Sequence, residues 1–498
     1  MKKLIALTLF IALAMTVLCC SALADQDTII FAQGSDVTSL DPHIGKQQRA
    51  FTVHGQMFEQ LVKFDENNEI VGVLAESWET LSATQTKFKI REGVKFHDGT
   101  ELTAEDVAYS FTRLMNTAVS KNNVSFLESA EAISEYEVVL TTKYAYSPLL
   151  SALTSPVLSI VPKHAVEADP EAFALNPIGT GAYRFVEWKP DEYCLMERFD
   201  DYWGEKAKTK YVKMIVVPEA SQRAIMLETG EIDVAYDLAP NDAVRMADVD
   251  GVQVLKTVSN KTIILYCNDS SEGPLGNPLV RRAIEMAIDK DLIVEVVLNN
   301  MATTANLGVP ISAVGYNADY ATPKYDVDAA KTLMAEAGYA DGFELTLWCD
   351  DDQIYTEVCT VVQDMLTELN ITVNIEIMST STKQTRLNEK QDFDMHISFF
   401  NNLINDVDYT FASTLVKDSA SNYSYYDNPE VEALIDQSRA CTDEEERQAI
   451  FNQIYEIIDR VCPSIPMYYE SVIVGARSNI SGFVPSRIGA HKYATVVK

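Results

Sequence analysis

Between residues 343 and 399 the apolar positions follow two different periods. Short apolar runs are separated by segments whose apolar residues recur every three or four positions, the spacing of one helical face. The pattern predicts strands at 343–347, 372–377 and 393–399, with helices at 354–369 and 382–390 between them. Further helices are predicted on either side of this block, at 278–288, 326–337, 429–440 and 443–461. Strands that alternate with helices are typical of α/β architecture.

The first half of the chain is richer in short strands. They are predicted at 28–32, 69–73, 86–90, 137–140, 181–186, 193–197 and 212–216. One helix lies among them, at 104–115, with Thr103 and Asp106 at the spacing of a capping box. Tyr109 lies off the apolar stripe of this helix. Because there is neither a fixed-period repeat nor a low-complexity linker, we expect interleaved lobes of one body.

The extreme N-terminus carries the one long apolar run, Leu4 to Leu18, after two lysines. With Ala22-Leu23-Ala24 as a cleavage site, residues 1–24 are predicted to be a signal peptide. The run is short for a membrane anchor, the alternative interpretation. Acylation at Cys19 or Cys20 is a second alternative, although Leu18 is a poor residue before an acylated cysteine. Each cleavage route predicts an exported protein, periplasmic or at the cell surface.

Composition and motifs narrow the function. The formal net charge of −33 disfavours a nucleic-acid partner, which needs a basic face. The six cysteines after the leader allow 15 pairings and show no zinc-ligand spacing. The motifs of nucleophile-elbow hydrolases, zinc proteases, nucleotide loops and EF-hands are missing from the sequence. The sequence therefore predicts no enzyme, no cofactor and no metal site.

Several collinear strings carry a resemblance. Residues 74–78 (LAESW) and 88–107 (FKIREGVKFHDGTELTAEDV) closely resemble the signature of the extracellular solute-binding proteins of oligopeptide, dipeptide and nickel ABC importers. Shorter matches follow at 39–43, 160–164, 179–183, 202–204, 228–233, 281–284, 422–424 and 463–466. The resemblance covers about residues 28–490.

The resemblance implies a flytrap fold, the two-lobed periplasmic-binding-protein architecture with an extra subdomain in lobe one and two hinge strands between the lobes. Lobe one is expected at 25–264, with 51–169 as its extra subdomain, and lobe two at 265–474. Residues 475–498 are expected to return to lobe one. The crossings are predicted near 261–268 and 467–474, because these stretches flank the α/β block.

Ligand-contacting positions are carried over from the family where the spacing has no gap. The set carried over is Lys46, Gln47, Gln48, Arg49, Tyr109, Phe400, Asn401, Asn402 and Leu403. Asp406 and Asp408, which lie close to Leu403 in the sequence, and Tyr468 in the second crossing are predicted as further ligand-contacting residues. Core packing is the alternative for Tyr109 and Phe400, and a solvated loop for Lys46 and Arg49. For Asp406 and Asp408 the alternative is a structural turn.

The resemblance implies a monomeric binding protein that captures a small solute, most often a short peptide. The protein is expected to deliver the solute to permease subunits with their ATPases. Within the family a nickel chelate, haem or an oligosaccharide are alternatives, and a secreted hydrolase is an alternative of another class. In peptide-binding members an aspartate of lobe two pairs with the peptide's amino group. Here Leu403 stands at that place, which predicts weak dependence on a free peptide N-terminus unless Asp406 or Asp408 takes over.

Overall fold

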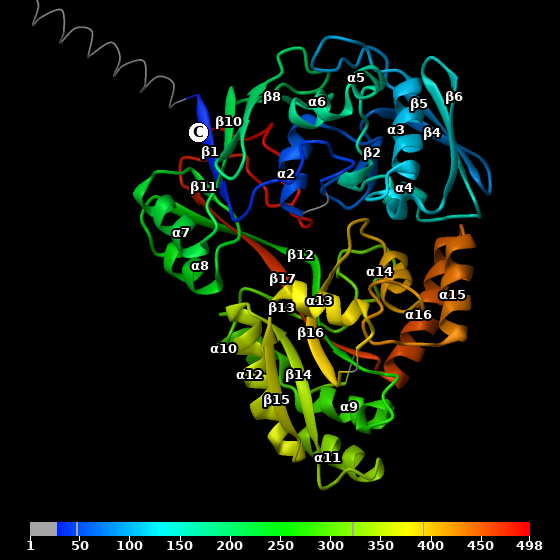
Figure 1. Ribbon diagram of the computed structural model, residues 1–498, viewed down its shortest axis with the longest axis vertical. Coiled ribbons are helices and arrows are strands. Elements are labelled where there is room, and N and C mark those ends of the chain that lie inside the picture. Colours follow the sequence, from blue (N-terminus) through cyan, green and yellow to red (C-terminus); the bar gives the residue numbers. More distant parts are fainter. Residues whose placement is uncertain (1–26, 46–47, 321–322, 392) are drawn as a thin grey trace, which may run out of the picture.

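Two long strands, β12 (Val252–Cys267) and β17 (Ser464–Arg477), pass through both halves of the molecule and pair with each other in antiparallel fashion. The computed structural model describes residues 27–45, 48–320, 323–391 and 393–498. In Figure 1 the two strands run between an upper lobe, lobe one, and a lower lobe, lobe two. One sheet of 11 strands therefore continues from one lobe into the other, in the order β15-β14-β16-β12-β17-β11-β1-β10-β9-β8, with β13 paired to β17.

Lobe one holds the half of this sheet that begins with the N-terminal strand. β1 pairs in parallel with both β10 and β11, and β11 pairs with β17. Its elements are β1 (Thr28–Gln33), α2 (Gln48–Met57), α5 (Lys163–Ala168), α6 (Pro170–Leu175), β8 (Tyr183–Lys189), β9 (Tyr193–Arg198), β10 (Tyr211–Val216), α7 (Ala220–Thr229), β11 (Val234–Ala235) and α8 (Pro240–Ala247).

A further part of lobe one, at the upper right of Figure 1, has two small antiparallel sheets, β2-β3 and β4-β5-β7-β6. Its hydrophobic core is built from residues between Phe51 and Ile160 and also includes Ile404 of lobe two. The elements are β2 (Val62–Phe64), β3 (Ile70–Gly72), β4 (Ala75–Ser82), β5 (Gln85–Ile90), α3 (Ala104–Asn116), η1 (Lys121–Val124), β6 (Leu127–Ser134), β7 (Glu137–Thr142), α4 (Leu149–Ala152) and η2 (Pro156–Leu158). We call this part the extra subdomain.

Lobe two is built on three parallel strands, in which β14 pairs with β15 and β16. Apolar side chains of these strands and of the flanking helices form one core. The elements are η3 (Pro274–Gly276), α9 (Pro278–Ala287), α10 (Lys290–Val296), β13 (Thr303–Thr304), α11 (Val327–Glu336), β14 (Glu344–Asp350), α12 (Gln353–Leu366), η4 (Thr367–Leu369), β15 (Thr372–Met378), α13 (Thr380–Asn388), β16 (Met395–Asn401), α14 (Val407–Thr414), α15 (Pro429–Ala440) and α16 (Glu444–Val461).

The pairing of the two crossing strands is interrupted at one place. Val258 pairs with Ser471 and Thr262 with Tyr469, so three residues of β12 lie opposite the single residue Glu470 of β17. Such a bulge bends a strand and increases its twist locally. The break lies between the two lobes, close to the predicted crossings, and we refer to this place as the hinge.

The secondary structure predicted between residues 343 and 399 is confirmed, as β14, α12, β15, α13 and β16. The capping box of Thr103 and Asp106 at the start of α3 is also present. The predicted lobe boundaries remain predictions. The predicted signal peptide, with Cys19 and Cys20, lies outside the described residues, and among the helices that are described none is long and apolar enough to cross a bilayer.

Candidate functional site

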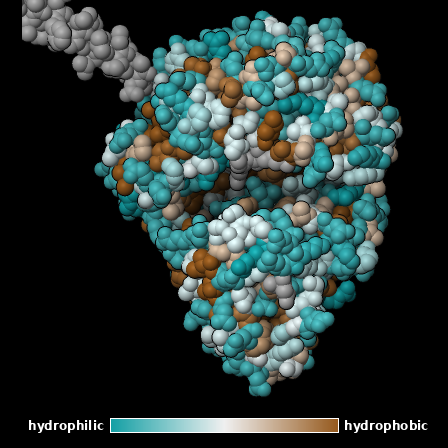
Figure 2. Space-filling view, viewed as in Figure 1, coloured by the Kyte–Doolittle hydropathy of each residue, from teal (hydrophilic) through white to brown (hydrophobic). Residues whose placement is uncertain are grey.

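A cavity of about 330 Å³ lies on the lobe-one side of the hinge. Its wall combines the end of β1, the start of α2, the loop after β11, the hinge break of β12 and β17, and the C-terminal loop. The lining residues are Gln33, Ser35, Arg49, Thr52, Tyr236, Asp237, Ser259, Lys261, Glu470, Ser471, Val472, Gly489 and His491. In the space-filling view a recess runs across the molecule between the two lobes (Figure 2).

The first charged pair of the wall is Arg49, near the start of α2, with Asp237. Asp237 has a φ of 49°, in the left-handed region, where a residue other than glycine is held only by its surroundings. Buried Arg223 supplies that support, since its guanidinium donates to the carbonyl oxygens of Tyr236 and Asp237 at 2.8 and 2.9 Å. The carboxylate of Asp237 is thereby held against the cavity.

The second charged pair is Lys261 with Glu470, with 2.5 Å between Nζ and Oε2. Lys261 also lies over the ring of Phe399, at 4.3 Å from its centroid. The cavity wall therefore carries two cations and two anions. A solute with both a positive and a negative group finds an opposite charge for each.

The rest of the wall is neutral at physiological pH. Burial lowers the pKa of His491 to about 4, so the imidazole is uncharged, and its Nδ1 accepts a hydrogen bond from the backbone of Ser486. The ring of His491 stacks on Tyr236 at 4.4 Å, and the Tyr236 hydroxyl donates to that of Tyr493. These contacts fix an aromatic floor beside the two charged pairs.

Of the predicted lobe-one residues, Arg49 lines the cavity. Lys46 and Gln47 lie outside the described residues, as does the side chain of Gln48, although Gln48 begins α2. Tyr109 is half-buried against the lobe-one core, which raises its pKa, and it does not line this cavity.

The predicted segment of lobe two divides between the core and the lobe interface. Phe400 is buried with Ile264 and Tyr266, whereas its neighbour Phe399 is 42% exposed. Asn401 is half-buried and lies opposite Lys261 in the sheet. Buried Asn402 donates to the Asp406 carbonyl oxygen at 2.7 Å and to Thr410 Oγ1 at 2.9 Å. Leu403 packs against the core of the extra subdomain.

Asp406 and Asp408 are both buried and both paired with arginines. Two nitrogens of Arg447 contact the two oxygens of Asp406, each at 2.9 Å, and Arg439 Nε donates to Asp408 at 2.9 Å. Burial raises the pKa of Asp408 to about 6, although Arg439 acts in the opposite direction. Neither lines the cavity at the hinge, nor does Tyr468, which is buried in the lobe-two core.

The sequence interpretation missed Asp237, Lys261, Glu470 and His491 as wall residues. A signal for two of them was available: Glu470 interrupts the apolar run of the predicted crossing 467–474, and Lys261 begins the predicted crossing 261–268. A charge inside an otherwise apolar strand has to find either a partner or water.

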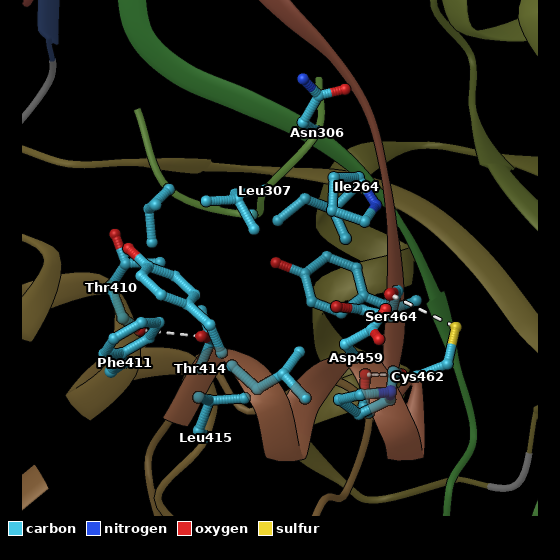
Figure 3. Close-up of a pocket in the computed structure, with 18 of the residues that line it drawn as sticks. Ile264, Asn306, Leu307, Thr410, Phe411, Thr414, Leu415, Asp459, Cys462 and Ser464 are labelled. Atoms are coloured by element: carbon cyan, nitrogen blue, oxygen red, sulfur yellow. Dashed lines mark hydrogen bonds between the residues drawn. The ribbon is translucent and has the colours of Figure 1, made fainter. Parts of the chain in front are cut away.

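A second, smaller cavity of about 60 Å³ lies inside lobe two. Figure 3 shows Leu307 on one side of the hollow and Phe411 and Leu415 on the other. The Tyr266 hydroxyl lines it and has no hydrogen-bond partner among the described residues. At roughly 15 Å³ per water, this space holds about four water molecules. It is solvent-sized, so the larger hinge cavity is the better candidate of the two for a solute site.

No group of three or more His, Cys, Asp or Glu side chains suited to a metal ion occurs in the described part of the chain. A nickel ion bound directly by protein ligands would need such a group or the residues outside that part. The charged groups of the hinge cavity are paired with one another instead.

Comparison with known proteins gives consistent matches over most of the chain. The sequence profile described as bacterial extracellular solute-binding proteins, family 5 Middle, matches residues 69–423. The glutathione-binding protein GsiB of Pectobacterium atrosepticum is 27% identical over 474 residues, 92% of each chain. The ABC transporter-associated periplasmic binding protein DppA of Helicobacter pylori, solved with the peptide STSA, has a TM-score of 0.81 at 26% identity, covering 95% of this chain and 99% of DppA. The structure of HbpA2 from Haemophilus parasuis has a TM-score of 0.84 at 25% identity, and the match covers 95% of this chain and 100% of HbpA2.

Proposed function

This chain belongs to the bacterial extracellular solute-binding proteins of family 5, and from that premise we propose that it captures a short peptide between its two lobes. Proteins of this family are the exported, solute-binding parts of ABC importers. The proposal concerns the solute, the place where it binds, and the absence of turnover after binding.

The observation that carries the proposal is the hinge cavity with its two ion pairs. A short peptide has an ammonium group at one end and a carboxylate at the other, and the wall offers charges of both signs. At about 330 Å³ the cavity lies at the low end of the roughly 300–1,000 Å³ that small-molecule sites occupy. This size favours a peptide of two or three residues over a long one.

The names of two similar proteins point the same way. GsiB is called a glutathione-binding protein, and DppA was solved with a peptide of four residues. Both cover more than nine-tenths of this chain. A nickel chelate, haem or an oligosaccharide remain alternatives within the family, and a hydrolase would have to convert the bound solute.

Closure of the lobes is the expected mechanism. A solute shifts a hinge equilibrium only as far as it binds the closed form better than the open one. We propose that the closed, monomeric binding protein is then recognised by the permease subunits, whose ATPases drive import. Cleavage after Ala24 and release, or acylation at Cys19 or Cys20, would decide how the protein stays near the membrane.

Small-angle scattering combined with native mass spectrometry tests the proposal. Protein purified from its own host should carry a co-purified solute, whose mass identifies a peptide or one of the alternatives. Adding that solute back to the stripped protein should reduce the radius of gyration and raise the melting temperature with concentration. Identical scattering with and without saturating solute would contradict capture by closure, and a converted solute would favour a hydrolase.

A further inference from the structure

The break in the hinge lies beside a residue that is bonded to both lobes. Asn260 belongs to the three-residue bulge of β12, and its backbone nitrogen donates to the Arg487 carbonyl oxygen of the C-terminal loop at 3.0 Å. Its side chain donates to Asn405 Oδ1 at 3.0 Å and to the Asn402 carbonyl oxygen at 3.2 Å, both in lobe two. A displacement of this bulge is therefore transmitted to both lobes.

The next residue of the bulge is Lys261, and the residue opposite the bulge is Glu470. The ion pair of Lys261 with Glu470 thus occupies the place where the ladder between the crossing strands is broken. The side chain of Lys261 is 19% exposed and that of Glu470 is 43% exposed, and both line the cavity. The carboxylate of Glu470 is the more accessible of the two groups to a solute.

An ion pair this accessible to water is weak, because solvent screens it. A second cation that is enclosed in the cavity can therefore compete with Lys261 for Glu470. Lys261 would keep a favourable contact after such an exchange, since its ammonium group already lies over the face of Phe399. After the exchange Glu470 is paired with the solute, and Lys261 keeps its contact with the Phe399 ring.

We propose that Lys261 and Glu470 form a charge sensor at the hinge, in which the ammonium group of the solute takes the place of Lys261 on Glu470. The sensor rests on the proposed function, because it acts on a solute in the same cavity. It goes further by naming the chemical group that is recognised and the hinge residues that respond to it.

The coupling to closure follows from the second carboxylate of the wall. Asp237 belongs to lobe one and Glu470 to a crossing strand, and both line the same cavity. An ammonium group enclosed there is attracted by Glu470 once Lys261 has left it, and by Asp237 against the opposing charge of Arg49. The net attraction is strongest when the cavity is closed and water is excluded. The cation thus binds the closed form better than the open form, which is the condition for shifting the hinge.

Isothermal titration with a synthetic dipeptide mixture, free and N-acetylated, tests the sensor. Wild type should bind the free mixture at least tenfold more tightly than the acetylated one. Glu470→Gln should remove this difference by weakening the binding of the free mixture alone. Lys261→Met should bind the free mixture as tightly as wild type or more tightly, because it removes the competing cation.

The pair Lys331 and Glu368 provides the control, since it is an exposed ion pair of 2.8 Å far from the cavity lining. Lys331→Met and Glu368→Gln should leave both titrations unchanged. Equal binding of free and acetylated peptides by wild type would overturn the sensor and leave peptide capture standing. If Glu470→Gln and Lys261→Met both weaken the binding of the free mixture to the same extent, the sensor is overturned and the ion pair is purely structural. If wild type binds neither mixture, the sensor is also overturned. The scattering experiment with the co-purified solute then still tests the proposed capture of a solute between the lobes.

Discussion

Asn405 of lobe two donates a hydrogen bond to Asn68 of lobe one, with 2.7 Å between Nδ2 and Oδ1. Asn68 in turn donates to the carbonyl oxygen of Ser312, and the Ser312 hydroxyl donates to Asn260 in the hinge bulge at 2.8 Å. This chain of hydrogen bonds joins the extra subdomain, lobe two and the hinge. We call this chain of hydrogen bonds the latch between the lobes.

Asn68→Ala should loosen the latch. The variant removes two hydrogen bonds to lobe two, each contributing about 1 kcal/mol, so the solute affinity should fall roughly 30-fold as the open form becomes more populated. The radius of gyration of the solute-free protein should rise in small-angle scattering. Asn67→Ala, which changes an exposed neighbour, is the matched control. Unchanged scattering and affinity in Asn68→Ala would show that closure does not depend on the latch.

Leu403→Asp tests the role of an apolar side chain at the lobe interface. Because Leu403 packs against the core of the extra subdomain, an aspartate there places a charge in an apolar contact. We expect closure to weaken and the free energy of unfolding to fall by about 1–3 kcal/mol. Denaturant unfolding and scattering measure the two effects. If the variant instead gains affinity for peptides with a free N-terminus, the new aspartate pairs with the peptide's amino group, as in peptide-binding members of the family.

Arg49→Met should reduce the affinity for solutes that carry a free carboxylate. A guanidinium binds a carboxylate through two parallel hydrogen bonds, which neither methionine nor lysine can reproduce. We expect a loss of about tenfold for a free dipeptide and a smaller loss for its C-terminal amide, measured by calorimetry. The affinity of Arg49→Lys for the free dipeptide should lie between those of wild type and Arg49→Met. Equal losses of affinity for both peptides would show that Arg49 shapes the cavity wall but does not bind the solute carboxylate.

Asp406→Ala should destabilise the fold without changing which peptide end is recognised. It would leave the guanidinium of Arg447, which is almost fully buried, without its charged partner. Removing one member of a buried pair costs about 3–5 kcal/mol, which urea unfolding would report. Asp436→Ala, at an exposed carboxylate 3.7 Å from Arg439, is the control. A selective loss of binding to free amines would instead place Asp406 in the solute site.

Two buried histidines of lobe one make stability depend on pH. Burial lowers the pKa of His43 and of His54 to about 4, and each Nε2 hydrogen-bonds a backbone oxygen at 2.8 Å. Unfolded imidazoles titrate near 6.5, so below this pH the unfolded chain takes up protons that the folded chain does not. The free energy of unfolding should therefore fall as the pH falls from about 6.5 to about 4, by about 2 kcal/mol per histidine between pH 7 and 5.

His54→Gln should lower stability at pH 7 but reduce the further loss at pH 5, when urea unfolding is compared at the two pH values. His164→Gln, at a half-exposed histidine paired with Asp98, serves as the control. An unchanged difference between the two pH values in His54→Gln would show that this imidazole does not contribute to the acid loss.

The periodicity of the sequence is enough to predict the parallel block of lobe two, because its strands and helices are each apolar on the face that meets one core. Strand β4 was not predicted, since most of its residues are exposed and an apolar pattern is lacking. Its pairing with β5 depends on backbone hydrogen bonds that leave no signature in the side chains.

The site was harder to predict for two physical reasons. Phe400 was carried over from the family's spacing, as part of a segment expected to follow the strand. In β16 neighbouring side chains point to opposite faces, and Phe399 is the exposed ring while Phe400 is buried. The pair of Arg49 and Asp237 joins residues 188 positions apart, a contact that local patterns cannot show. Lys261 and Glu470 were visible as isolated charges, but their partnership depends on the register of the two crossings.

The position of β17 within the sheet has a consequence for the order of synthesis. β17 lies between β12 and β11, in the middle of the sheet that lobe one shares, yet its last residue is Arg477. A chain that emerges N-terminus first cannot complete the sheet of lobe one before the whole of lobe two has followed. Until then β11 and β12 lack the partner that joins them, and their exposed edges are open to pairing with other chains. A ribosome or export channel that stalls within lobe two therefore holds both lobes unfinished, even though most of lobe one was made first.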